Sequence, residues 1–396
     1  MLYIVILILF VLVPDIYIWW QFVRENPIGL NILYWMPTAA LFAALAVAMS
    51  GHYVEALMKP FFVLMLCFAM PKLLFAICSL AGKGLGTFIP AAFTVGNIVG
   101  LAVAAIVLCG AVYGFTIGWK RMEVKEISIA FAELPDAFDG YTIVQLSDLH
   151  IGTYTSSPEV VRKLVNTVNA IKPDAILFTG DLVNTSPKEL DIFMDVLSRL
   201  KAADGVYSIL GNHDYCTYRR YDTPDGQRKN LAEVKRRERE LGWHLLLNEH
   251  HVIHRGTDSI AILGVENDGK PPFPALADLP KAIKGLPKDV FKVLMSHDPT
   301  HWRRAILPET DIPLTLSGHT HAMQLKIGNF SPSQWQYPEW GGIYTEGNRT
   351  LHVSTGTGSN VPFRLGAWPE IDVIRLTLSS SLCKGGLCWT AKRKKF

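Results

Sequence analysis

The sequence has little charge in its first 119 residues and no large excess of either sign over its whole length. Of its 396 residues, 49% are hydrophobic, 18% are charged, and the formal net charge is +3. A balance this close to neutral gives no electrostatic reason to expect nucleic acid as a partner. The charged residues gather after residue 119, and a membrane region followed by a water-soluble region explains this division.

Cysteine is also scarce, and its six positions form no disulfide framework. Three cysteines lie in apolar segments and are expected to fill packed interiors: Cys67, Cys78 and Cys109. Cys216 stands alone, whereas Cys383 and Cys388 could pair with each other. The spacing of these last two and the lack of a second matching pair argue against a zinc site. The cysteine usage is compatible with a reducing compartment.

The apolar first part lacks the basic start and the small-residue cleavage site of a signal peptide. We therefore interpret its first apolar run as a membrane span. Four runs are each close to the ~20 residues that a helix needs to cross hydrocarbon. They cover residues 1–21, 31–50, 60–80 and 89–118. The sequence thus predicts an integral membrane protein with a four-helix transmembrane region.

Two charges inside these runs, Asp15 and Lys72, are expected to pair with each other or to reach the membrane surface, rather than to form a functional site. Basic residues are most frequent after the fourth run, at Lys120, Arg121 and Lys125. Because cytoplasmic flanks are enriched in lysine and arginine, this pattern predicts a cell (inner) membrane protein with its water-soluble domain in the cytoplasm.

After the membrane region, short apolar runs alternate with segments of helical periodicity. Strands are expected at residues 141–146, 175–179 and 206–210, and helices at residues 158–170 and 187–201. This alternation predicts parallel strands with right-handed crossovers, and ligands gather at the carboxyl ends of such strands. Later strands are expected at residues 291–295, 314–316, 342–345, 350–354 and 371–377.

The predicted domain organisation has four parts. These are a transmembrane domain (1–119), a connector with an edge strand (120–140), an α/β domain (141–378) and a basic tail (379–396). The tail carries a short charge run and is expected to be disordered and solvated, or else to contact anionic lipid weakly. Within the α/β domain, residues 215–242 form a strongly basic insert with a helix expected near residues 229–241.

Side chains of metal-ligand type follow several of the predicted strands. Asp148 and His150 come first, one residue apart. Four further clusters follow: Gly180-Asp181, Gly211-Asn212-His213-Asp214, Ser296-His297-Asp298 and Gly318-His319-Thr320-His321. Two divalent ions ~3.5–4 Å apart can activate water and clamp a phosphoryl group. Aspartate, histidine and asparagine without cysteine suit Mn, Fe or Zn in such a site, so the clusters predict two divalent metal ions.

The phosphate ester also needs a proton donor for its leaving oxygen. A histidine held by a neighbouring carboxylate suits this task, and His213 followed by Asp214 is the natural candidate.

These five clusters resemble the motifs of the calcineurin-like metallophosphoesterases. With four membrane helices in front, the chain resembles a membrane-attached branch near YaeI/YkuE-type phosphoesterases and the transmembrane proteins with a metallophosphoesterase domain. The resemblance covers about residues 141–375. It implies an α/β fold, namely a four-layer α-β-β-α metallophosphoesterase sandwich preceded by the transmembrane region.

The resemblance also implies roles for individual residues. One metal ion would be held by Asp148, His150, Asp181 and His321. A second would be held by Asp181, Asn212, His297 and His319, so that Asp181 bridges the two. His213 would protonate the leaving group or steady the phosphoryl oxygens, and Asp214 would orient it. The reaction implied is hydrolysis of a phosphate ester or pyrophosphate by metal-activated hydroxide.

The basic insert is where the sequence departs from the family pattern, so its role stays open. It could hold a phosphorylated substrate, with Arg219 and Arg220 as candidate binding residues, or it could be a solvated helix with paired glutamates and arginines. A membrane-proximal site favours a phospholipid or a nucleotide-linked lipid as substrate. The alternative function is a receptor or transporter-like membrane protein that uses the fold as a non-catalytic binding module. The intact ligand set and His213 weigh against that alternative.

Overall fold

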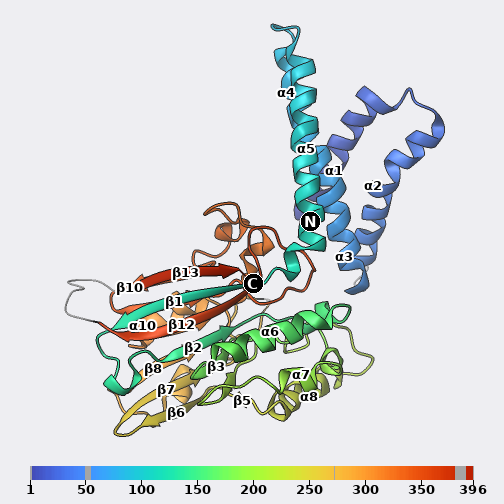
Figure 1. Cartoon of the computed structure of the whole chain (residues 1–396). Coiled ribbons are helices and arrows are strands. Elements are labelled where there is room, and N and C mark those ends of the chain that lie inside the picture. Colours follow the sequence, from blue (N-terminus) through green and yellow to red (C-terminus); the bar gives the residue numbers. More distant parts are fainter. Residues whose placement is uncertain (1, 50–54, 272, 380–388, 396) are drawn as a thin grey trace. The chain divides into compact units, whose positions relative to one another are not determined.

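The computed structural model describes residues 2–49, 55–271, 273–379 and 389–395 (Figure 1). Cys383 and Cys388 lie outside the described residues, so their pairing stays a prediction. The chain divides into two compact units. The first comprises Met1–Ile117 with Val361–Leu365, and the second comprises Gly118–Asn360 with Gly366–Phe396.

The first unit is helical. Its elements are α1 (Leu2–Ile18) with the π-helical turn η1 (Trp19–Val23), α2 (Ile28–Met49), α3 (Glu55–Leu64), the π-helical turn η2 (Met65–Ala69), α4 (Met70–Leu85) and α5 (Ala92–Thr116). Within the described residues, four continuous helices are long and apolar enough to cross a membrane: Ile6–Val23, Ile28–Val47, Leu57–Leu85 and Ala92–Lys120. The predicted four-helix membrane region is therefore confirmed.

The two charges inside the membrane helices pair with each other, as expected. Lys72 Nζ lies 2.8 Å from Asp15 Oδ1, and Asp15 is 1% exposed. The hydroxyl of Thr38 donates to the same carboxylate, and the Tyr34 ring lies 4.2 Å from the ammonium group. A paired and hydrogen-bonded carboxylate costs far less in hydrocarbon than an isolated one.

The second unit contains two mixed β-sheets. The seven-stranded sheet has the order β13-β1-β12-β2-β3-β4-β5, and the six-stranded sheet has the order β10-β11-β9-β8-β7-β6. The strands of the first sheet are β1 (Glu123–Phe131), β2 (Thr142–Leu146), β3 (Ala175–Phe178), β4 (Val206–Ser208), β5 (His244–Leu245), β12 (Glu370–Leu378) and β13 (Trp389–Lys395). Those of the second are β6 (Glu249–Arg255), β7 (Asp258–Gly264), β8 (Phe291–Met295), β9 (Leu314–Ser317), β10 (Gly342–Glu346) and β11 (Arg349–Val353).

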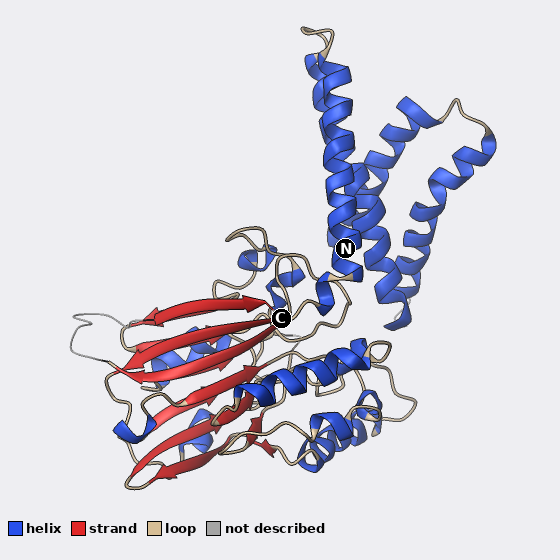
Figure 2. Cartoon of the chain, viewed as in Figure 1, coloured by secondary structure: helices blue, strands red, loops and turns tan. Residues whose placement is uncertain are grey.

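Three buried cores separate four layers (Figure 2). Ile143 of β2 and Ile262 of β7 belong to the core between the sheets. Val144 faces the opposite way, because successive strand side chains alternate, and belongs to the core beneath the helices. The helices over the first sheet are α6 (Pro158–Ile171), α7 (Met194–Leu197) and α8 (Gly226–Glu240), and those over the second include α9 (Leu279–Ile283) and α10 (Leu307–Glu309). The predicted α-β-β-α arrangement is confirmed.

Two sequence predictions of local structure are wrong. The helix expected at residues 187–201 is reduced to a 3-10 turn, Pro187–Leu190, and the four-residue α7. Glu189 accounts for the break, since its carboxylate turns back to accept the backbone N–H groups of Asn184, Thr185 and Ser186. In the tail expected to be disordered, the described residues 389–395 form β13, which pairs antiparallel with β1 and so covers the hydrogen-bonding edge of that strand.

The helix expected in the basic insert is present as α8, and its outer face carries ion pairs. Arg236 pairs with Glu233 and Glu240, and Arg237 pairs with Glu233 and with Asp191 outside the helix. This arrangement matches the paired, solvated helix that was one of the two interpretations of the insert. Exposed pairs of this kind add little to stability, because water and salt screen the charges.

The inner face of α8 buries a carboxyl group. Glu238 is fully buried, one helical turn after the buried Val234. Burial, together with the nearby Asp214, raises the pKa of Glu238 well above its ordinary value. The folded chain therefore keeps a proton that the unfolded chain releases above about pH 4.3. The contribution of Glu238 to stability is full below that pH and is lost as the pH rises toward the raised folded pKa.

We expect Glu238→Gln to raise the free energy of unfolding at pH 8 and to leave it nearly unchanged at pH 5. Glutamine keeps the shape of the protonated acid but cannot ionise, so the loss of stability with rising pH disappears. The measurement is urea unfolding of the detergent-purified full chain at both pH values, followed through the unfolding transition of the second unit. Glu240→Gln, on the exposed side of the same helix, is the control. An equal increase in the free energy of unfolding at pH 5 and pH 8 would contradict the raised pKa of Glu238.

Candidate metal centre

The side chains predicted to bind metal meet at the carboxyl ends of strands from both sheets. Asp148 and His150 follow β2, Asp181 follows β3, and Asn212 follows β4. His297 follows β8 in the second sheet, and His319 and His321 follow β9. All seven residues are buried or nearly so. We call these seven residues the metal centre.

Four of them form a first group around one point. Asp148, His150, Asp181 and His321 each offer a ligand atom, and these atoms all lie within 4.8 Å of one another. His150 Nε2 is 3.2 Å from His321 Nε2 and 3.6 Å from Asp181 Oδ2. His321 Nε2 is 3.4 Å from Asp148 Oδ1. Ligands at roughly 2.0–2.2 Å from one ion are separated by about these distances, so the cluster fits a divalent metal ion.

A second group lies on the other side of Asp181. Asn212 Oδ1 is 2.8 Å from His319 Nδ1 and 3.2 Å from His297 Nε2. His297 Nε2 is in turn 3.3 Å from Asp181 Oδ2. The same oxygen of Asp181 therefore borders both groups, which is the geometry of a carboxylate shared between two neighbouring sites.

Neighbouring atoms fix the orientation of these side chains. His297 Nδ1 lies 2.7 Å from the carbonyl oxygen of Thr179, which can only accept, so the lone pair is on Nε2. The Tyr337 hydroxyl is 2.9 Å from His319 Nε2 and leaves Nδ1 facing Asn212. The Ser147 hydroxyl donates to Asp148 Oδ2 at 2.6 Å. Such outer contacts hold ligands ready before an ion arrives.

The backbone at the metal centre is strained. Five of its residues have left-handed φ values, at 45° to 74°: Asp148, His150, Asp181, His319 and His321. A non-glycine residue in this region costs about 1–3 kcal/mol, and such residues cluster at functional sites. Two motif glycines allow the close approach of the strand ends: a Cβ at Gly211 would overlap the Asp181 carboxylate, and one at Gly318 would overlap that of Asp148.

The electrostatics of the centre favour a cation. Burial acts to raise the pKa of Asp181, but the imidazoles of His297, His213 and His150 hold it well below its usual range. Burial acts to lower the pKa of His297, but the Asp181 carboxylate outweighs it and raises that pKa to about 10. A buried anion thus holds a proton on its neighbour, and a divalent ion can replace that proton because metal ligands must be deprotonated.

His213 lies beside the centre, and its orientation differs from the expected one. His213 Nδ1 is 2.6 Å from the carbonyl oxygen of Asn184, so this nitrogen carries the proton and Nε2 is the nitrogen left for other partners. The expectation that Asp214 orients His213 is wrong. The carboxylate of Asp214 accepts the backbone N–H groups of Asp181, Leu182, Val183 and Gly211 instead. It fixes the two loops that carry Asp181 and Asn212.

The basic insert contributes a tyrosine that the sequence analysis missed. The Tyr218 ring stacks on His213 with centroids 4.3 Å apart, and its hydroxyl accepts a hydrogen bond from Asn212 Nδ2 at 2.7 Å. This bond turns Asn212 Oδ1 toward the two histidines. Arg219 and Arg220, which follow, lie exposed on the insert. The only feature of the sequence that could have indicated a role for Tyr218 is its position, six residues after the metal-ligand candidate Asn212.

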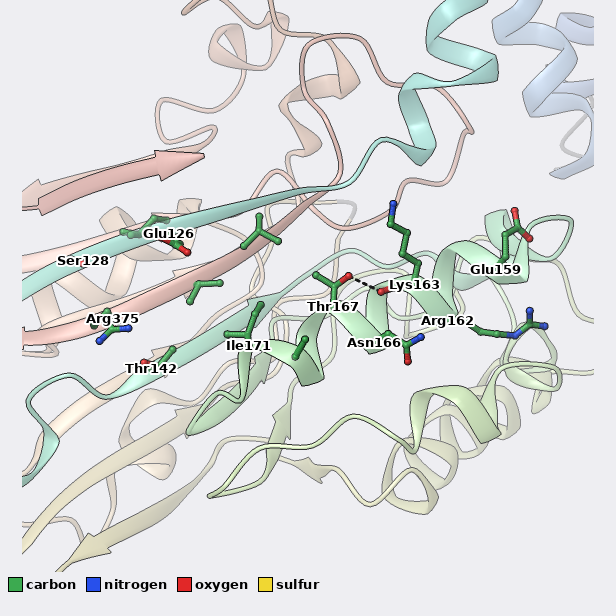
Figure 3. A pocket seen from close by; sticks show the side chains of 14 residues that line it. Glu126, Ser128, Thr142, Glu159, Arg162, Lys163, Asn166, Thr167, Ile171 and Arg375 are labelled. Carbon is green, nitrogen blue, oxygen red and sulfur yellow. Dashed lines mark hydrogen bonds between the residues drawn. The ribbon is translucent and has the colours of Figure 1, made fainter. Parts of the chain in front are cut away.

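A groove of about 820 Å³ lies apart from the metal centre, between α6 and the outer face of β1 and β12 (Figure 3). Arg162 and Lys163 of α6, Arg375 of β12 and Glu126 of β1 are among its lining residues. None of the seven residues of the metal centre lines it. Its mixed charge singles out no ligand, so we assign it no part in the chemistry.

A strand-end cluster of aspartates and histidines between two stacked sheets defines a metallophosphoesterase domain. Comparison with known families agrees: the calcineurin-like phosphoesterase family matches residues 141–323. A family described as the transmembrane domain of probable calcineurin-like phosphoesterases matches residues 1–119. The chain thus carries a calcineurin-like metallophosphoesterase domain behind an N-terminal phosphoesterase transmembrane domain.

Curated relatives include YkuE of Bacillus subtilis, described as an uncharacterized metallophosphoesterase. It is 29% identical over 292 residues, or 70% of this chain and 94% of the relative. The transmembrane protein with metallophosphoesterase domain of Danio rerio is 29% identical over 300 residues, or 71% of this chain. The match spans 62% of that relative's length. Among solved structures, the phosphopantetheinyl hydrolase of Mycobacterium tuberculosis is 14% identical, with 56% of this chain and 91% of that chain covered and a TM-score of 0.36.

Proposed function

We propose that this protein is a membrane-anchored, binuclear-metal phosphoesterase that hydrolyses a phosphate ester or a pyrophosphate. The observation that carries the proposal is the position of Asp181 Oδ2, which lies 3.6 Å from His150 Nε2 and 3.3 Å from His297 Nε2. These nitrogens belong to separate ligand groups. A shared carboxylate of this kind is what a pair of neighbouring ions requires.

Each group of side chains would hold one ion. The first ion would take Asp148, His150, Asp181 and His321, and the second would take Asp181, Asn212, His297 and His319. The mixed oxygen and nitrogen donors suit Mn, Fe or Zn. When bound, the ions would supply charge for the phosphoryl oxygens and would lower the pKa of an attacking water.

The chain's own groups would do the remaining work. When its ring is protonated on both nitrogens, His213 would give the Nε2 proton to the leaving oxygen and would then be neutral, with its remaining Nδ1 proton held by the Asn184 carbonyl. The Tyr218 ring keeps the imidazole plane fixed. Asp214 would act indirectly. Its carboxylate accepts four backbone hydrogen bonds and so fixes the positions of the loops that carry Asp181 and Asn212.

The membrane region bears on the substrate and the location. We infer that the substrate is phosphorylated and lipid-linked, with phospholipids and nucleotide-linked lipids as the leading candidates and Arg219 and Arg220 as possible contacts. We also infer that the protein resides in the cell (inner) membrane with its metal centre on the cytoplasmic side. The basic residues after the fourth span support that orientation.

Metal removal tests the proposal. We expect the detergent-purified full chain to hydrolyse bis(p-nitrophenyl) phosphate, to lose this activity after chelation, and to regain it with added Mn²⁺. Metal analysis of the active protein is expected to give two ions per chain. Full activity in protein shown to be free of metal would refute a metal-dependent reaction, and full activity at one ion per chain would refute the binuclear one. A panel of phospholipids, nucleotide-sugars and cyclic nucleotides would then narrow the substrate.

A further inference from the structure

The loop that follows the last histidine of the metal centre exposes large apolar side chains. Seven large hydrophobic residues are exposed in the described part of the second unit, and four of them fall within residues 323–335. They are Met323 (43% exposed), Ile327 (66%), Phe330 (38%) and Trp335 (77%). We call residues 323–335 the apolar loop. A cluster of exposed apolar side chains on a water-soluble domain is typical of an interaction surface.

The composition of this region suits one kind of surface. Across residues 322–338 the sole charged residue is Lys326, although 18% of the whole chain is charged. Tryptophan with a few apolar neighbours and a lysine is typical of protein surfaces at the headgroup level of a bilayer. Lys326 also lies over the ring of Trp340, at 5.3 Å. The loop therefore combines apolar contact area with a single positive charge.

The backbone of the apolar loop is well fixed. Ile327 and Phe330 exchange two backbone hydrogen bonds, at 2.9 and 3.0 Å, and close a two-residue turn at Gly328 and Asn329. The Phe330 ring meets the Trp335 ring edge to face, with centroids 5.6 Å apart. The buried Ser331 donates its hydroxyl to the carbonyl of Ala322 at 2.6 Å. Ser331 and Ser333 are thus buried, whereas Ile327, Phe330 and Trp335 are exposed.

The same loop is joined to the metal centre at both ends. Thr320 donates its hydroxyl to the carbonyl of Trp340 at 2.6 Å, and Tyr337 contacts His319 Nε2 at 2.9 Å. Ala322, Met323 and Gln324, which come directly after His321, all have left-handed φ values, of 50°, 45° and 61°. Backbone strain of this kind is kept at positions where function requires a set geometry.

The apolar loop packs on a residue that is covalently continuous with the unit holding the membrane segments. The carbonyl group of Lys326 contacts Gly366 so closely that any side chain at that position would overlap it. Gly366 follows directly on Val361–Leu365, and these five residues belong to the same compact unit as the transmembrane helices. The bilayer is therefore the partner that covalent attachment brings within reach of this surface.

We propose that the apolar loop lies in the headgroup region of the bilayer, where the adjoining metal centre acts on amphiphilic phosphate esters or pyrophosphates whose chains stay in the membrane. The substrate class in this statement rests on the proposed phosphoesterase function, whereas the lipid contact does not. Lipid chains would pack on Ile327, Phe330 and Trp335, and the phosphate would project toward His319 and His321.

Lipid cross-linking tests the contact itself. The full chain in nanodiscs of phosphatidylcholine and phosphatidylglycerol with a photoreactive phosphatidylcholine is expected to yield lipid adducts on the tryptic peptide of residues 327–349. The peptide of residues 189–199 is the matched control, because its Ile192 is 58% exposed and lies outside the apolar loop. Equal labelling of both peptides, or no lipid adduct on the peptide of residues 327–349, would overturn the proposal.

Kinetics test the substrate class separately. The double variant Ile327→Ser/Trp335→Ser is expected to raise KM for long-chain phosphatidic acid by roughly tenfold or more, since each side chain loses its apolar contact. Its turnover of bis(p-nitrophenyl) phosphate should stay within about twofold, as should both activities of Ile192→Ser. Equal effects on both substrates would refute the substrate class. If the parent protein hydrolyses neither substrate, the phosphoesterase function and the substrate class fail together, and the cross-linking result still decides the lipid contact.

Discussion

If the proposed binuclear phosphoesterase function holds, Asp181→Asn is expected to remove nearly all hydrolytic activity and at least one of the two proposed metal ions. The reason lies in how the asparagine amide must be oriented. Asp181 Oδ1 accepts the backbone N–H of His213 at 2.8 Å, so the oxygen of an asparagine would keep this place. Its NH₂ group would then occupy the position of Oδ2, between His150 and His297, where a lone-pair donor is needed. The substitution therefore removes both the shared ligand and its negative charge.

The expected loss of turnover is about 10³-fold or more, since the metal ions supply most of the stabilisation of the phosphoryl transition state. Measurements of kcat on bis(p-nitrophenyl) phosphate with added Mn²⁺, alongside metal content per chain, would show it. Asp195→Asn is the matched control, because the Asp195 side chain is 81% exposed on α7. Parental turnover and two ions per chain in Asp181→Asn would show that the shared-ligand assignment is wrong.

His213→Ala is expected to leave both metal ions bound and to slow hydrolysis in a way that depends on the leaving group. General acid catalysis contributes about 10²–10⁴-fold when the leaving oxygen needs a proton. An alkyl phosphate ester should therefore lose most of its turnover, and a p-nitrophenyl ester should lose less, because nitrophenolate leaves without protonation. The comparison of kcat for the two ester types is the measurement.

His213→Asn provides the sharper variant at this position. Its amide NH₂ can take the place of Nδ1 and keep the hydrogen bond to the Asn184 carbonyl, but it supplies no acid. We expect the same leaving-group dependence as for His213→Ala. His254→Ala, at an exposed histidine, is the control. Equal losses for the two ester types would assign His213 to binding the phosphoryl oxygens, and loss of metal would assign it a structural role.

The gathering of the seven metal-centre residues could be predicted because they sit at strand ends. Short apolar runs that stop in Asp148 or Asp181 identify the strands, and the carboxyl ends of parallel strands meet at one sheet edge. Periodicity also sufficed for α6, and the length of the apolar runs sufficed for the four membrane segments. The pairing of Asp15 with Lys72 followed from the cost of an isolated charge in hydrocarbon.

Other features depend on contacts that no sequence pattern reports. Asn184 holds His213 through a backbone carbonyl, a group that every residue has, so nothing in the side chains pointed to it. Tyr218 and Tyr337 act through ring and hydroxyl contacts made by loops without periodicity. The strand β13 forms because β1 offers it a free edge, which depends on the order of strands in the sheet.

The short segment Val361–Leu365 has a consequence for any attempt to separate the two halves of the chain. Phe363 lies against Gly114 and Phe115 of α5, and Leu365 lies against Gly110. Cutting the polypeptide after Ile117 would remove α5 and expose the apolar side chains of Phe363 and Leu365 to water. Both residues would stay in the fragment, because their segment is continuous with Gly366 of the second unit. A stand-alone catalytic fragment would therefore tend to aggregate or to recruit detergent at this spot unless Phe363 and Leu365 were first exchanged for polar residues.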